Sequence, residues 1–194
     1  MDKTTAPQYP DWLNSTLASD AAEGRGVLAG WIHALNLGSH VIGPAFIAVG
    51  SHDDNLVVRR MTAEAPPPAG YVLVVVGQST SRTATVGNLI ALEIQNLGVV
   101  GLITDGLVRD SNEIRQQKLP VWCRGVTPIA SAKRDPGVIG GTVIIGGVLV
   151  REGDWVIGDD DGIVIWPKGN IEELLKKAKE KLDIDTDRLA RLMQ

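Results

Sequence analysis

The sequence feature that most constrains the fold is a series of short apolar runs, rich in Val and Ile and bounded by Gly, Pro or Asp. Runs of this length and composition are typical of buried β-strands. Two of them flank Asp159-Asp160-Asp161-Gly162, a segment typical of a hairpin turn. The sequence therefore predicts a sheet built from the runs Pro44–Val49, Val72–Val76, Val99–Thr104, Val143–Val150, Trp155–Ile157 and Ile163–Trp166.

Two helices are predicted between these runs. Residues 86–97 carry Leu89, Ile90, Ile94 and Leu97 on one face and stop at Gly98, a residue type that commonly follows a helix end. Residues 110–118 form the second helix, which ends before Pro120. Alternation of strand and helix predicts a partly parallel βαβ layer, followed by a more antiparallel, glycine-rich region.

The two ends of the chain are predicted to be helical or loose. Residues 1–20 are polar and form an arm or a short helix, and residues 26–35 have apolar spacing compatible with a helix despite two glycines. From Asn170 a third helix is predicted, with Asn170 and Glu173 as a capping box. Its apolar stripe consists of Leu174, Leu175, Ala178 and Leu182.

Length and charge limit the classes of function. A chain of 194 residues with 44% apolar and 22% charged residues fits one globular domain. The net charge of −4 argues against nucleic acid as a partner, because binding it requires concentrated Lys and Arg. No stretch approaches the roughly 20 apolar residues of a membrane span, and Met1–Pro7 do not resemble a signal peptide. We therefore expect a soluble, cytoplasmic protein without a membrane partner.

The strongest candidate for chemistry is the segment Thr104–Asp110, which follows an apolar strand and begins a helix. Ligands of α/β sheets gather at the carboxyl ends of strands. Arg109 offers a planar fork for a carboxylate, and Asp110 offers the hard oxygens that Mg²⁺ or Mn²⁺ prefers. A purely structural interpretation is favoured by these residues alone, because caps are common at helix starts: Asp110 and Glu113 also fit a capping box, and Arg109 could pair with a surface acid.

A second candidate is the loop from Gly77 to Asn88, which is rich in Gly, Ser and Thr and leads into the helix predicted from residue 86. Free amides at a helix start attract a carboxylate or a phosphate. The glycine spacing fits neither a Walker loop nor a dinucleotide fingerprint, so the loop alone is weak evidence for anion binding.

The remaining reactive residue types do not form a recognisable motif. His33, His40 and His52 lack the spacing of a zinc site. Cys123 is the only cysteine, which excludes an internal disulfide, and it is predicted to be a small core residue rather than a nucleophile. The lysines lie in polar stretches, which disfavours a Schiff-base mechanism because that chemistry needs a desolvated lysine.

Taken together, these segments resemble the family that contains regulator of ribonuclease activity A and the metal-dependent 4-hydroxy-4-methyl-2-oxoglutarate aldolases. The resemblance covers residues 26–167, between an N-terminal arm (1–25) and a helical tail (168–194). Its most specific piece is the run Gly98–Asp110, which ends in Arg109-Asp110. Supporting pieces are Gly43-Pro44-Ala45, Gly77–Gly87, Leu119–Trp122, Gly146-Gly147-Val148, Gly153-Asp154 and Asp159–Val164.

The resemblance implies an α/β/β sandwich of the swivelling phosphohistidine-domain type, assembled as a homotrimer or homohexamer. It also implies a site at the subunit interface where a divalent metal, Mg²⁺ or Mn²⁺, and pyruvate bind. In that site Arg109 holds the substrate and stabilises the enolate, Asp110 is the metal ligand, and backbone amides at Gly87, Asn88 and Leu89 hold the pyruvate carboxylate. The implied reaction breaks a C–C bond of a small-molecule 2-oxo acid, either by aldol cleavage or by decarboxylation of oxaloacetate.

The sequence departs from the family pattern at one position. Active members carry an acid, then twenty residues, then Arg-Asp, and here the position of the acid is occupied by Asn88. An amide can accept a hydrogen bond from a metal-bound water, but it cannot act as a base. Arg82, inside the loop, is a candidate for binding an additional substrate carboxylate. Three functions therefore stay open: a lyase, a protein-binding regulator of a ribonuclease, and an enzyme with another reaction at the same site.

Overall fold

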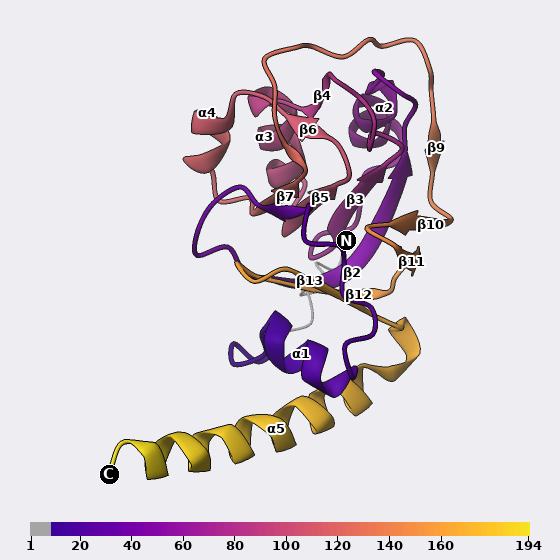
Figure 1. The fold of residues 1–194 in the computed structure, drawn as a ribbon. Coiled ribbons are helices and arrows are strands. Elements are labelled where there is room, and N and C mark those ends of the chain that lie inside the picture. The colour runs from indigo at the N-terminus through magenta and orange to yellow at the C-terminus, as the bar shows by residue number, and fades with distance from the viewer. Residues whose placement is uncertain (1–8) are drawn as a thin grey trace.

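The computed structural model, which describes residues 9–194, has a mixed α/β fold around one eight-stranded sheet (Figure 1). The order of the main sheet is β1-β7-β5-β3-β2-β12-β13, with β9 also paired to β2. Its strands are β1 His33–Ala34, β2 Val41–Val49, β3 Val72–Val76, β5 Gly101–Thr104, β7 Val121–Cys123, β9 Val138–Ile139, β12 Trp155–Gly158 and β13 Ile163–Trp166. The helices are α1 Ser15–Ala21, α2 Leu56–Glu64, α3 Asn88–Asn96, α4 Ser111–Arg115 and α5 Ile171–Leu192, with a 3-10 turn at Lys168–Asn170.

The parallel half of the sheet consists of β2, β3, β5 and β7. All five residues of β3 are buried, because this strand lies between neighbours and is covered on both faces. The helices α2 and α3 connect consecutive parallel strands, and both contribute to the core on one face. The predicted βαβ layer is therefore confirmed, and Cys123 lies within it as a buried residue of β7 whose pKa is raised by burial.

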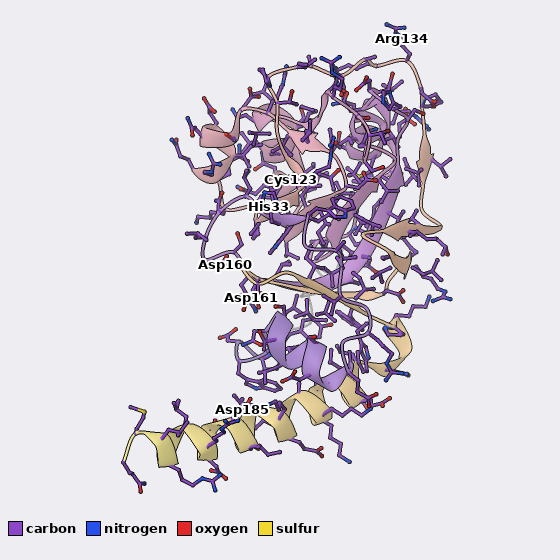
Figure 2. All side chains as sticks on the ribbon, in the orientation of Figure 1. His33, Cys123, Arg134, Asp160, Asp161 and Asp185 are labelled. Atoms are coloured by element: carbon purple, nitrogen blue, oxygen red, sulfur yellow. The ribbon has the colours of Figure 1, made fainter. Side chains whose placement is uncertain are left out.

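The antiparallel half pairs β12 with both β2 and β13. The predicted hairpin turn joins β12 to β13, and Asp159 N donates to Gly162 O at 3.0 Å. Figure 2 shows Asp160 and Asp161 at this turn. The prediction of one buried strand over Val143–Val150 is wrong. This run forms a separate hairpin of β10 Thr142–Ile145 and β11 Val148–Arg151. Gly146 and Gly147 have φ angles of +54° and +81°, and they turn the chain between the two strands.

The helix predicted over residues 26–35 is wrong. Gly26 has φ +74°, and a Cβ there would lie 2.2 Å from the carbonyl oxygen of Ile165, so the chain runs against β13 instead of coiling. Val27 bridges Val164, and β1 then pairs with β7. The apolar residues of segment 26–35, such as Leu28 and Ile32, are buried against the sheet, which explains why their spacing resembled that of a helix.

The C-terminal helix is confirmed as α5, and its first half packs on α1 through the fully buried Leu174 and Ala178. Asn170 precedes it but makes no side-chain capping bond, so the predicted capping box is wrong. The far end of α5 extends away from the body (Figure 1). Among residues 9–194, no helix has the length and apolarity needed to cross a membrane.

Candidate functional site

The Arg109-Asp110 pair is positioned by a small three-stranded parallel sheet of β4 Ala84–Val86, β6 Leu107–Val108 and β8 Gly125–Val126. Parallel strands end at the same edge, so the residues after β4 and after β6 lie next to one another. Arg109 N donates to Val86 O at 3.0 Å, which fixes this register. The two segments that the sequence singled out separately, around Gly87 and around Arg109, therefore form one site.

The side chain of Asp110 does not cap its own helix. Asp110 is the residue before α4 and has a left-handed backbone with φ +55°, but it makes no side-chain capping bond. Its Oδ2 instead accepts a hydrogen bond from Asn88 N, the first amide of α3, at 3.1 Å, and lies 3.6 Å from Arg109 Nε. The capping box proposed for Asp110 and Glu113 is therefore wrong, and the carboxylate is directed toward Arg109 and α3.

Gly87 allows these groups to approach closely. A Cβ at this position would lie 2.7 Å from Asp110 Oδ2 and 2.8 Å from Arg109 Nε. Both distances are shorter than real Cβ contacts, so any larger residue would displace the guanidinium, the carboxylate or both. The backbone φ of Gly87 is −121°, an ordinary extended value, so the need for glycine here is one of space rather than of conformation.

The start of α3 supplies backbone donors to the same site. Ala91 N donates to Gly87 O at 3.0 Å, which begins the helical ladder. The amides of Leu89 and Ile90 precede that bond and have no intrahelical acceptor. The side chain of Leu89 is 73% exposed, so it does not belong to the buried apolar face of the helix as the sequence had suggested. Of the other predicted residues, Ile94 is buried on that face, and Ile90 and Leu97 pack against the core as partly buried side chains; the buried Ala91 also belongs to the face.

Asn88 is held by a residue that the sequence analysis did not identify. Gln117, which follows α4, donates its Nε2 to Asn88 Oδ1 and also to Asn88 O at 3.2 Å. Gln117 therefore uses one of the two acceptor positions of Asn88 Oδ1, and the second can still accept a hydrogen bond.

These residues line a cavity of about 290 Å³. Gly87, Asn88, Leu89, Arg109 and Asp110, five of the six predicted site residues, are part of its wall. Arg82 does not line the cavity. It is an exposed residue whose backbone is held elsewhere: its N donates to Asp53 Oδ1, and its O accepts from Thr127 Oγ1. The sequence analysis missed the other residues that line the cavity, namely Asn55, Arg59, Ala84, Ile90, Glu93, Ala130, Ser131 and Lys133.

Asp105, in the same motif as Arg109, has a supporting position instead. It is 6% exposed, and its carboxylate accepts hydrogen bonds from Gly77 N at 3.1 Å and Gln78 N at 2.9 Å. Burial raises the pKa of Asp105, although the two amides and the nearby Arg124 act in the opposite direction. Asp105 thus fixes the start of the loop that leads to β4.

A divalent metal fits this site with one protein carboxylate. Among residues 9–194, no three His, Cys, Asp or Glu side chains gather into a metal-binding cluster. Mg²⁺, however, commonly binds through one or two carboxylates and completes its shell with water and substrate oxygens. Asp110 is 42% exposed at the cavity wall, and only its Oδ2 is engaged within the described chain. Its Oδ1 is therefore a ligand of the right kind.

Fold and site together define a mixed α/β protein with a cavity lined by Arg59, Arg109 and Lys133 together with Glu93 and Asp110. The family model for RraA-like proteins, described as Aldolase/RraA, matches residues 15–165, and the chain belongs to this family. A relative from Halalkalibacterium halodurans, provisionally named a 4-hydroxy-4-methyl-2-oxoglutarate aldolase, is 36% identical over 169 residues, which cover 87% of this chain and 80% of the relative.

Solved structures of the same family share the fold. Streptomyces coelicolor RraAS2, described as an unusual member of the RNase ES inhibitor RraA family, superposes with a TM-score of 0.76 at 28% identity, over 94% of each chain. The RNA-processing inhibitor RraA from Thermus thermophilis superposes with a TM-score of 0.72 at 28% identity, over 80% of this chain and 93% of that one. Relatives named for an enzyme and relatives named for an inhibitor therefore share one fold.

Proposed function

We propose that this protein is a divalent-metal-dependent lyase that breaks a C–C bond of a 2-oxo acid and releases pyruvate. The observation that carries the proposal is the arrangement of Asp110: its carboxylate leaves its own helix uncapped and lies instead beside Arg109 and the first amide of α3. The relatives named as aldolases support the reaction class. Aldol cleavage of a 4-hydroxy-2-oxo acid and decarboxylation of oxaloacetate both belong to it.

The reaction needs a site that stabilises negative charge on a pyruvate enolate. In aldol cleavage, the C3–C4 bond breaks and its electron pair moves to C3, while the C4 hydroxyl loses its proton and becomes a carbonyl. Arg109 donates to the oxygens of the 2-oxo acid with a rigid fork, and the free amides of Leu89 and Ile90 face the substrate carboxylate. Donors fixed before the reaction stabilise the charge as it develops.

Asp110 would hold the metal ion, Mg²⁺ or Mn²⁺. When bound, the metal supplies Lewis-acid polarisation of the 2-oxo group. The ion pair with Arg109 keeps the Asp110 carboxylate in place, and Gly87 leaves room for both. Because the Asn88 amide cannot act as a base, the proton of the C4 hydroxyl is taken by another group, either of the same chain or of a neighbouring subunit.

We also propose that the protein is a homotrimer or homohexamer of α/β/β sandwiches related to swivelling phosphohistidine domains. The cavity is lined on its outer side by exposed residues such as Leu89, which a neighbouring subunit would cover. Light scattering at micromolar concentration is expected to give at least three times the chain mass of 20.7 kDa. A mass equal to that of one chain would contradict the assembly.

The decisive experiment is pyruvate release from 4-hydroxy-4-methyl-2-oxoglutarate and from oxaloacetate, each with Mg²⁺, with Mn²⁺ and with a chelator. We expect release from at least one substrate, abolished by the chelator and restored by the metal. Asp110→Asn should reproduce the effect of the chelator, because the amide keeps the shape of the side chain but is a poorer metal ligand. Absence of metal-dependent release from both substrates would overturn the lyase proposal.

A second candidate function is a protein-binding regulator of a ribonuclease. The observation that favours it is Asn88, which replaces an acid and is held by Gln117. Structural relatives that are described as ribonuclease or RNA-processing inhibitors agree with it. A regulator would inhibit ribonuclease activity in a reconstituted assay equally well with Arg109 replaced, whereas a lyase would lose its turnover.

A further inference from the structure

The cavity carries more positive charge than pyruvate and a metal require. Arg59, Arg109 and Lys133 line it together with two acids, Glu93 and Asp110. Arg109 is paired with Asp110, but among residues 9–194 neither Arg59 nor Lys133 has an ion-pair or side-chain hydrogen-bond partner. The described lining of the cavity therefore has three cations and two acids, although the protein as a whole has a net charge of −4.

Hydrogen bonds hold the two segments that carry Arg59 and Lys133 together. Lys133 lies on the loop after β8, and Figure 2 labels the next residue, Arg134, at the outer edge of the molecule. The loop is fixed to the start of α2: Asn55 N donates to Ala132 O at 3.1 Å, and Ala132 N donates to Asp53 O at 2.9 Å. Arg134 N donates to Asp54 Oδ2 at 2.7 Å. Arg59 follows one turn later on α2, so both cations are carried by one connected unit.

Asn55 connects that unit to the catalytic side. Its Nδ2 donates to Thr85 O in β4 at 2.9 Å, three residues before Asn88. The residue is 8% exposed and lines the cavity, and its Oδ1 has no hydrogen-bond partner within the described chain. An asparagine before a helix usually caps it, yet this side chain makes no capping bond to α2. This acceptor requires a donor such as a water molecule, so a carboxylate in the cavity is held by the cations of this wall and not by Asn55 Oδ1.

We propose that Arg59 and Lys133 are specificity-determining residues that bind the second carboxylate of the substrate, on the half that leaves as the non-pyruvate product. This inference rests on the proposed lyase function for its orientation, since Arg109, Asp110 and the α3 amides hold the 2-oxo acid half. It assigns to Arg59 and Lys133 the role that the sequence had suggested for Arg82, whose exposed side chain lies outside the cavity.

Binding of two uncleavable ligands of equal length tests the proposal without requiring turnover. 2-Oxoglutarate carries the second carboxylate, and 2-oxopentanoate has a methyl group in its place; neither has a C4 hydroxyl, so neither undergoes aldol cleavage. Calorimetric titration of the full-length protein in Mg²⁺ should show 2-oxoglutarate binding about 10- to 100-fold more tightly, the range expected for a charge-assisted hydrogen bond.

Arg59→Gln and Lys133→Gln should each remove most of this preference and leave the affinity for 2-oxopentanoate unchanged, which also shows that the variants are folded. Arg82→Gln is the matched control, because it removes an exposed arginine outside the cavity, and it should keep the preference. Equal affinity of the wild-type protein for the two ligands, or loss of the preference in Arg82→Gln instead, would overturn the assignment.

A parallel assay separates this inference from the lyase proposal. 4-Hydroxy-2-oxoglutarate and 4-hydroxy-2-oxopentanoate differ by the same replacement, and each would release pyruvate. Selective binding of 2-oxoglutarate without pyruvate release would refute the lyase and keep the two-carboxylate site. Pyruvate release from both compounds with equal kcat/KM, unchanged in Arg59→Gln, would keep the lyase and refute the assignment of Arg59 and Lys133.

Discussion

The two walls of the cavity differ in how they are built. One wall, formed by Gly87–Ile90 with Arg109 and Asp110, comes from the ends of two parallel strands that lie side by side. The other, with Asn55, Arg59 and Lys133, comes from a helix start and a long loop that are joined by backbone hydrogen bonds. The first wall is fixed by strand register and by Gly87, which leaves the space at the start of α3 that the side chains of Arg109 and Asp110 occupy.

This difference indicates a division of labour in the proposed reaction. The groups that would act on the reacting atoms lie on the wall that strand register and Gly87 fix in place, where an error of 1 Å costs about 100-fold in rate. The groups that would select the rest of the substrate lie on exposed, longer side chains. We therefore expect substitutions on the first wall to lower kcat, and substitutions on the second to raise KM.

The largest effect is expected for Arg109→Lys. Lysine keeps the positive charge but loses the bidentate fork, so the substrate and the enolate are held less rigidly. We expect kcat/KM for pyruvate release to fall by about 100-fold or more, with most of the change in kcat. Circular dichroism should show an unchanged melting temperature, because the side chain is half exposed. Wild-type turnover in this variant would remove Arg109 from the mechanism.

Gly87→Ala tests the close contact of the first wall. The added methyl would meet Asp110 Oδ2 at 2.7 Å and Arg109 Nε at 2.8 Å, so both groups must shift. We expect a loss in kcat approaching about 100-fold, and weaker Mg²⁺ binding by titration. Gly169→Ala is the control, because nothing lies within 4 Å of a Cβ at that position. Equal activity of the two variants would show that the contact does not matter.

Asn88→Asp sharpens the comparison at the residue where the family pattern is broken. The new carboxylate would accept from Gln117 Nε2 and add negative charge beside Asp110. If the site is a family lyase with a weakened surrounding shell, Mg²⁺ affinity and pyruvate release should both rise, by about 10-fold or more. Tighter metal binding without faster release would argue against aldol cleavage and leave only the metal site.

The sequence predicted the first wall better than the second, for a physical reason. Arg109, Asp110 and the loop to Asn88 follow apolar strands, and the ends of parallel strands converge, so pattern alone brings them together. Arg59 and Lys133 are 74 positions apart on a helix and a loop, and hydrogen bonds such as those of residues 53–55 to residues 132 and 134 bring them to one cavity. No local periodicity records such a contact.

The errors in the fold have similar causes. Residues 26–35 had the apolar spacing of a helix, but their burial comes from packing along β13, with Gly26 pressed against the Ile165 backbone. Val143–Val150 was one apolar run, but Gly146 and Gly147 fold it into a hairpin. The run Val72–Val76, by contrast, is a strand with those same bounds, because a central parallel strand has few alternatives to full burial.

The smallest effect is expected for Glu113→Ala, which separates the structural interpretation of the Arg109 motif from the chemical one. If Asp110 and Glu113 formed a capping box, removing the glutamate would weaken the start of α4, and loss of a helix cap typically costs about 1 kcal/mol of unfolding free energy. In the structure neither side chain makes that contact, and Asp110 instead accepts from Asn88 N. Alanine is a good helix former, so urea unfolding should place Glu113→Ala within about 0.5 kcal/mol of the wild type. Pyruvate release should also be unchanged, whereas Asp110→Asn, one turn earlier, should lose its metal-dependent activity at nearly wild-type stability. A loss of about 1 kcal/mol in Glu113→Ala, together with full activity in Asp110→Asn, would show that the motif begins a helix and does nothing more.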